Sequence, residues 1–340
     1  MVPSFFRNIP ILGVLAIASL AAGSRAGDTE VWVSTAWGTG YDLQDVLRGH
    51  PNLKRVYLPL FQMAPSLTDK PFATPETYLQ KLAGSYEMLH ARGIEVFGVF
   101  TPLRLDDAAQ AVVRPEWCEQ PYATAFDKAK PTPWLSIYHP QVAAFCERTL
   151  AECLSRTKID GVVLNLAYSA SVYLGYSQTV REDTIRRLGF DPVDIDYPLG
   201  PPFDGRLKDQ SLIDDLVNDR ALATRKLIDS LAGVCKNAGR KFGVFGSLNI
   251  YDYAVSTQVA ALGDWATVLH DHPSAFAVLA MVQGDAMSAN NLRQFVANAT
   301  SHGIDLSLLR VLTGNDPAER TAIAETNEPR LTTTLMLRKN

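Results

Sequence analysis

The sequence predicts an α/β protein with a (β/α)8 barrel, because eight short apolar runs alternate with amphipathic stretches along the chain. The apolar runs are rich in β-branched residues, which is typical of strands buried on both faces of a parallel sheet. The stretches between them keep helical spacing, and several end at a glycine. With 340 residues, 47% of them hydrophobic, the chain is long enough for one such barrel.

Eight segments are predicted as strands. The fourth is the most distinctive, because the apolar run Val162–Leu164 breaks abruptly into Asn165. The second contains Pro59, which cannot donate to a sheet ladder and so weakens the prediction there. In chain order the predicted strands are 30–37, 56–61, 94–100, 162–164, 241–247, 275–281, 306–312 and 331–337.

Helices are predicted between the strands from capping residues and spacing. Thr74 and Pro75 suit the N-cap and first position of a helix that Gly93 ends, and Pro140 begins another. A long helix is expected to stop at Gly239. The remaining predicted helices are 212–238, a short piece beginning at 264–265, 288–302 and a helix after residue 317.

One barrel domain, residues 27–340, is predicted, with an insertion at about 169–210 after the fourth strand. That segment is rich in tyrosine and turn-forming residues, and we expect it to pack over one end of the sheet. The connection from 101 to 134 is also long and aromatic-rich, and such connections are more often functional than idle. A doubly wound open sheet is the alternative fold. The chain lacks a glycine-rich dinucleotide motif and a phosphate loop, so no nucleotide or other cofactor is expected.

Residues 1–26 are predicted to be a signal peptide, which places the protein in a secreted or periplasmic location. Arg7 precedes the apolar run Ile11–Ala22, and Ser24 and Ala26 are small residues suited to cleavage after Ala26. The run is shorter than the ~20 residues that span a bilayer, so no stable membrane anchor is expected after cleavage. A net charge of -4 with no basic block gives no general attraction for nucleic acid.

The four cysteines are interpreted as buried apolar thiols, although an oxidising compartment permits disulfides. Cys146 and Cys153 are about 10 Å apart along one predicted helix, too far to bridge there. No metal site is predicted. The one histidine cluster, His270 and His272 before Pro273, suits a solvated turn at least as well as a ligand pair.

Polar and aromatic residues follow the predicted strands, where parallel barrels collect their binding groups. This mixture suits a sugar-like ligand, whose rings pack on aromatic faces while its hydroxyls form fixed hydrogen bonds. The predicted partner is therefore a saccharide. The residues predicted to bind it are Asn165, Tyr168, Trp37, Asn249, Arg104 and Gln283.

Glycoside cleavage needs two carboxyl groups roughly 5 to 9.5 Å apart, one acting as acid and one as base or nucleophile. Asp285 follows the sixth predicted strand and is the candidate acid. Asp252, after the fifth strand, or Asp183, in the predicted insertion, is the candidate partner. Asp160 precedes the fourth strand, at the end of a barrel associated with stability, and is interpreted as part of a structural Asp-Gly turn.

Several segments together resemble the family-10-like glycosyl hydrolases of unknown specificity, which are (β/α)8 proteins. The resemblance spans most of the chain after residue 26 and includes segments 134–142, 159–168, 175–177, 188–192 and 264–265. It implies glycoside hydrolysis. This chain differs from the family at two positions. Those proteins usually carry a presumed catalytic aspartate where this chain has Asn165, and an aromatic residue where it has Gln283. An amide cannot act as nucleophile or general acid, but it still forms hydrogen bonds.

Two functions follow from these observations. The first is hydrolysis of a poly- or oligosaccharide. The alternative is a catalytically degraded barrel that binds a saccharide without cleaving it, which Asn165 favours. A lyase or isomerase on the same barrel is a third possibility, since fold does not fix the reaction. The sequence leaves the oligomeric state and the sugar specificity open.

Overall fold

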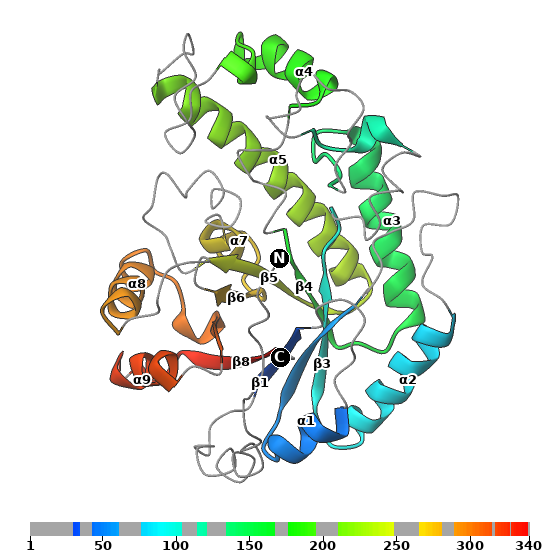
Figure 1. The fold of residues 1–340 in the computed structure, drawn as a ribbon, viewed down its shortest axis with the longest axis vertical. Coiled ribbons are helices and arrows are strands. Elements are labelled where there is room, and N and C mark those ends of the chain that lie inside the picture. Colours follow the sequence, from blue (N-terminus) through cyan, green and yellow to red (C-terminus); the bar gives the residue numbers. More distant parts are fainter. Residues whose placement is uncertain are drawn as a thin grey trace, which may run out of the picture.

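The computed structural model describes residues 30–34, 43–60, 76–103, 114–120, 134–166, 176–194, 210–247, 265–280, 289–314, 317–326 and 328–338. Eight parallel strands follow one another in chain order around a closed barrel, and β8 pairs with β1 (Figure 1). The predicted fold class is confirmed. The open-sheet alternative is wrong, because an open sheet has two edge strands and this one has none.

The strands agree with the predicted segments except near their ends. Residues 306–308 form a short 3-10 helix, η5, rather than the start of a strand, because Asp305 accepts a hydrogen bond from the Ser307 amide at 2.9 Å. Pro59 is the last residue of its strand, where a missing N–H is tolerated. The strands are β1 Glu30–Ser34, β2 Arg55–Pro59, β3 Glu95–Phe100, β4 Gly161–Leu164, β5 Lys241–Ser247, β6 Phe276–Ala280, β7 Leu309–Thr313 and β8 Thr332–Arg338.

Helices occupy the connections on the outside of the barrel (Figure 1). Two of them, α1 and α4, were not predicted. Gly93 and Gly239 have positive φ angles of 70° and 65° beyond helix ends, as expected of glycines that stop a helix. The helices are α1 Leu43–Gly49, α2 Glu76–His90, α3 Pro140–Arg156, α4 Gln178–Leu188, α5 Gln210–Asn237, α7 Trp265–Asp271, α8 Ala289–Ser301 and α9 Pro317–Thr326, with short 3-10 helices η2 Pro115–Trp117 and η4 Pro192–Asp194.

The segment predicted as an insertion contains α4 and η4, between β4 and α5. Residues 167–175 and 195–209 of this region lie outside the described residues. Within the described part, α4 is tied to its surroundings. Phe190 and Leu216 form a small buried cluster between the end of α4 and α5. The insertion itself stays a prediction.

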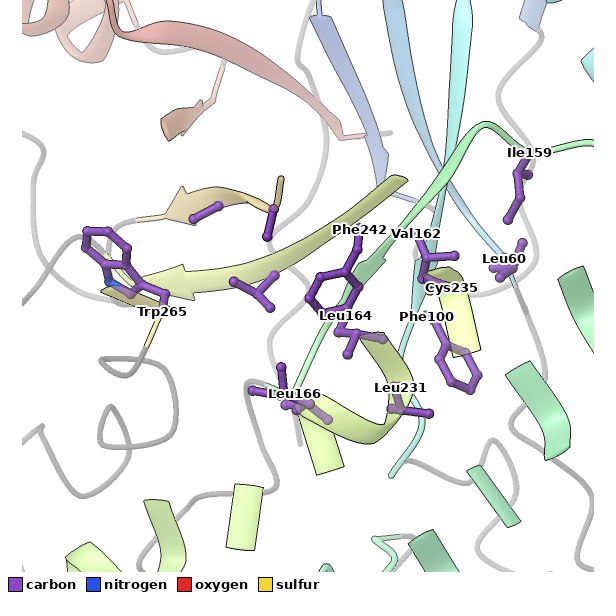
Figure 2. Close-up of a cluster of buried hydrophobic side chains, with 14 of the residues drawn as sticks. Leu60, Phe100, Ile159, Val162, Leu164, Leu166, Leu231, Cys235, Phe242 and Trp265 are labelled. Carbon is purple, nitrogen blue, oxygen red and sulfur yellow. The ribbon is translucent and has the colours of Figure 1, made fainter. Parts of the chain in front are cut away.

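The barrel has two apolar regions on opposite sides of its strands. Aromatic side chains fill the interior, where the rings of Trp32 and Tyr57 stack with centroids 5.4 Å apart and those of Phe97 and Phe276 meet edge to face at 5.1 Å. The larger region lies between the strands and the helices. Figure 2 shows part of it, with Val162, Leu164 and Leu166 alongside Leu231 and Cys235 of α5.

Two glycines make room for the interior aromatics. Gly161 pairs in register with Phe97, and a Cβ added to Gly161 would lie 2.3 Å from Phe97 Cε1. Gly243 has the same relation to Phe276, at 2.6 Å from its ring. Gly161 is therefore the first strand residue rather than part of a turn. Asp160 before it accepts hydrogen bonds from the Val96 amide at 2.7 Å and pairs with His90, so its predicted structural role is confirmed.

Replacing Gly161 with alanine should lower the free energy of unfolding by roughly 1 to 3 kcal/mol, because Phe97 must leave its position in a packed interior. Urea denaturation of the variant measures this loss. Gly233→Ala is the matched control, since a Cβ there meets nothing within 4 Å. Equal stability of Gly161→Ala and the parent protein would contradict this packing argument.

Buried charges close the N-terminal end of the barrel. Glu30, Arg55 and Glu95 are the first residues of β1, β2 and β3. Arg55 donates hydrogen bonds to Glu30 at 3.1 Å and to Glu95 at 2.6 Å, while the Tyr57 hydroxyl donates to Glu30 at 2.7 Å. Arg310 lies 3.6 Å from Glu30 on the other side. In parallel barrels, ligands bind at the opposite, C-terminal end of the strands.

The four cysteines are buried and form no disulfide, which confirms the interpretation as buried thiols. Cys146 and Cys153 both lie on α3. Burial raises the pKa of Cys153 and of Cys235 to about 12, so both side chains are thiols rather than reactive thiolates at neutral pH.

No helix within the described ranges is long and apolar enough to cross a membrane.

Candidate functional site

Asn165 lies at the C-terminal end of β4. Its backbone N–H donates to the Phe100 carbonyl at 2.8 Å, which extends the β3–β4 ladder by one residue. Leu164 and Leu166 on either side belong to the core between strands and helices. Because side chains alternate along a strand, Asn165 is on the same side as Val163, which belongs to the barrel interior.

The described interior below Asn165 is apolar. Val163 precedes it by two residues on β4, Val99 lies beside that residue on β3, and Ala280 ends β6. The Asn165 side chain is half-buried at the edge of this apolar interior. Its amide can donate and accept hydrogen bonds, but it has no proton that can be transferred in catalysis. This arrangement can orient a hydroxylated ligand at the barrel mouth. It cannot by itself supply acid or base chemistry.

Most of the other predicted site residues lie outside the described part of the chain. Their positions relative to Asn165 remain predictions. These residues are Asp285 and Asp252 among the candidate carboxylates and Tyr168, Trp37, Asn249, Arg104 and Gln283 among the candidate binding residues.

Asp183 is described, and it lies on α4. Its carboxylate accepts a hydrogen bond from Arg187 at 2.7 Å and pairs with Arg186. Burial opposes ionisation, but the hydrogen bonds from both arginines hold the pKa of the Asp183 carboxyl below its usual range. An ionised carboxylate suits a base or nucleophile and not a general acid.

The side chain of Asp183 lines a cavity of 390 Å³ between α3 and α4. Asn165 is not among its described lining residues, so the structure does not bring these two predicted site residues together in one cavity. The lining residues are Glu116, Ser136, Tyr138, His139, Pro140, Ser177, Thr179, Val180, Glu182, Asp183 and Arg186. The sequence did not single out the others as site residues, although the long connection that ends at Trp134 was expected to be functional.

The histidine cluster is held by carboxylates. His272 Nε2 lies 2.9 Å from Asp229 on α5, and His270 Nδ1 lies 3.1 Å from Asp271. Across the described residues, no group of three or more histidine, cysteine, aspartate or glutamate side chains is placed to hold a metal ion.

Comparisons with known proteins identify the class of fold. No protein-family model matches the chain, and no curated protein matches its sequence. Among solved structures, the glycoside hydrolase domain of PgaB (BpsB) from Bordetella bronchiseptica superposes with a TM-score of 0.55 and 13% identity, covering 92% of this chain and 94% of that one. A GH36 α-galactosidase, AgaA from Geobacillus stearothermophilus, gives 0.53 and 12%, covering 92% of this chain but 39% of that one.

The protein thus has the (β/α)8 barrel fold found in these glycoside hydrolases. At such identities the likeness concerns the fold. The reaction has to be argued from the site.

Proposed function

We propose that the protein is a carbohydrate-active barrel of the glycoside hydrolase class, which acts on a poly- or oligosaccharide at the C-terminal mouth of the barrel. The observation that carries the proposal is the position of Asn165. It follows β4 on the interior side of a closed parallel barrel, at the end where such barrels perform their chemistry. The fold match to a glycoside hydrolase domain along nearly its whole length supports the same class.

In this proposal Asn165 hydrogen-bonds a sugar hydroxyl, and proton transfer comes from carboxylates on the loops beyond the strands. Asp285 acts as the general acid. Asp252 is its preferred partner, because Asp183 is held by two arginines on α4 and lines a cavity whose described lining does not include Asn165. The family-10-like affiliation is part of the proposal, as is a secreted or periplasmic location after removal of residues 1–26. Sequencing the N-terminus of the mature protein tests the location.

The second candidate function is saccharide binding without turnover. The amide of Asn165 favours it, because the resemblance places a presumed catalytic aspartate at this position. Calorimetric binding of a saccharide that is never cleaved would support this candidate over hydrolysis.

Replacing Asp285 with asparagine should lower the rate of polysaccharide hydrolysis by about 100-fold or more, because the leaving-group oxygen loses its proton donor. The measurement is reducing-sugar release from a panel of polysaccharides. Asp305→Asn is the control, since Asp305 caps η5 near the N-terminal end of β7. Hydrolysis that is unchanged in Asp285→Asn would show that another residue supplies the proton.

A further inference from the structure

The cavity between α3 and α4 lies on the same side of the barrel as Asn165. The chain runs from His139 along α3 to Arg156 and then enters β4 at Gly161, so the start of α3 lies near the C-terminal end of the strands. The Leu135 amide donates to the carbonyl of Leu103, just beyond β3, at 2.8 Å. The segment before α3 is therefore anchored to the rim of the barrel mouth.

Three separate segments of the chain build the frame of this cavity. Cys118 and Leu135 form an antiparallel bridge, and the Ser136 amide donates to the Trp117 carbonyl at 2.7 Å. The Tyr176 amide, just before α4, donates to the carbonyl of Gln120 at 3.1 Å. Backbone hydrogen bonds therefore hold the walls together, independently of any ligand.

The α4 wall is fixed as well. Ser177 caps the helix by accepting a hydrogen bond from the Val180 amide. Arg181 makes a two-pronged pair with Asp191, with a shortest distance of 2.6 Å. Arg187 pairs with Asp219 of α5, and Figure 1 shows α4 beyond the barrel beside the first turns of α5. A wall that is ordered before binding keeps the entropy cost of binding low.

Neutral polar groups face the cavity from both sides. Ser136 is only 2% exposed, and its hydroxyl accepts a hydrogen bond from the Tyr138 amide at 3.4 Å. Ser177, the N-cap of α4, and Thr179 on α4 also line the cavity, and both carry hydroxyl groups. Burial lowers the pKa of the His139 imidazole, although nearby Glu116 opposes this, so the ring is neutral at pH 7. Its Nδ1 is buried and has no hydrogen-bond partner within the described residues.

Each charged side chain of the lining forms an ion pair or a hydrogen bond with another side chain of the protein. The Asp183 carboxylate pairs with Arg186 and Arg187. Glu116 lies 3.7 Å from Arg114, and Glu182 accepts a hydrogen bond from Gln178 at 2.8 Å. An anionic ligand would meet three carboxylates, those of Glu116, Glu182 and Asp183, while the one guanidinium of the described lining, Arg186, is already paired with Asp183. A neutral ligand rich in hydroxyl groups meets hydrogen-bond donors and acceptors without this repulsion.

From this cavity we propose a second saccharide subsite, which holds a neutral sugar unit of a chain whose reacting part lies at the barrel mouth. Its volume of 390 Å³ is within the usual range of small-ligand sites. The inference rests on the proposed function, since it assigns a substrate class to the same end of the barrel. It predicts that longer neutral oligosaccharides bind more tightly than disaccharides, because they occupy both places.

The variant Thr179→Trp tests the subsite by filling it. Thr179 is an exposed lining residue, so a larger side chain can enter the cavity without disturbing the core. Ile185→Trp is the matched control, because Ile185 is 45% exposed on the same helix and does not line the cavity. The ligands are disaccharides and hexasaccharides of the malto-, cello- and galacto- series, and calorimetry measures their affinities for the full-length mature protein.

We expect Thr179→Trp to weaken hexasaccharide binding by about tenfold or more, to the level of the disaccharide, and to leave disaccharide binding unchanged. Ile185→Trp should bind both as the parent protein does. Unchanged hexasaccharide binding in Thr179→Trp would overturn the subsite while leaving the proposed function in place. Failure of the parent protein to bind or cleave any saccharide would refute the proposed function itself.

Discussion

Replacing Arg55 with methionine is expected to lower the free energy of unfolding by about 3 kcal/mol, the lower end of the range for breaking a buried ion pair, because Arg310 still lies 3.6 Å from the Glu30 carboxylate that Arg55 leaves. Glu30, which is 6% exposed, loses its donor at 3.1 Å and keeps hydrogen bonds from Tyr57 and Thr334. The pKa of Arg55 is raised even though burial opposes it, because Tyr57, Glu30 and Glu95 all stabilise its charged form.

The guanidinium of Arg55 also packs against the aromatic interior at the N-terminal end of the barrel. It lies over the ring of Phe97 at 4.7 Å and over that of Phe276 at 5.5 Å. Methionine fills similar space along the side-chain stem. The loss of stability therefore reports mainly on the charge and its hydrogen bonds and not on the packing of the stem.

Urea denaturation measures the change, and Lys241→Met is the matched control. Lys241 pairs with Glu95 but is 57% exposed, so its removal should cost at most about 1 kcal/mol. If Arg55→Met were as stable as Lys241→Met, the charge cluster would not stabilise the barrel.

Under the second candidate function, saccharide binding without turnover, the barrel lacks a catalytic carboxylate at position 165, and replacing Asn165 with aspartate is expected to raise the rate of saccharide hydrolysis by about 10² to 10⁴-fold, the usual contribution of a positioned acid or base. The substitution keeps the side-chain shape and adds a carboxylate on the interior side of β4, where the resemblance places a catalytic aspartate. Reducing-sugar release under identical conditions measures the gain.

Asn165→Ser is the control for this prediction, because a hydroxyl keeps hydrogen bonding but adds no carboxylate. We expect no gain from it. A rate for Asn165→Asp that stays at the parent level would show that position 165 does not face the scissile bond. Equal rate gains from both variants would show that the gain comes from the changed side-chain size and not from proton transfer.

The strands could be predicted because each is a short run of apolar residues between polar ends. Helix α4 could not, since its sequence is mostly polar and few of its residues, among them Val180 and Thr184, are buried. Ion pairs such as Arg181–Asp191 fix it instead, and sequence spacing does not reveal such pairs. Gly161 was predicted to be part of a turn. Its strand position depends on its neighbour across the sheet, Phe97, and the sequence does not show which residues pair across strands.

The position of Asn165 at a strand end could also be predicted, because a break in an apolar run marks the end of a buried strand. The cavity between α3 and α4 could not. Its walls come from residues 116, 136–140 and 177–186, and the bridge between Cys118 and Leu135 that joins two of these segments leaves no periodic signal in the sequence.

We propose that a saccharide binds at the C-terminal mouth of this barrel. The most direct measurement is a crystal structure of the mature protein with a bound hexasaccharide. We expect a sugar ring within hydrogen-bonding distance of the Asn165 amide, above the apolar interior around Val163. A saccharide bound only at the N-terminal end, or elsewhere with the mouth empty, would contradict it.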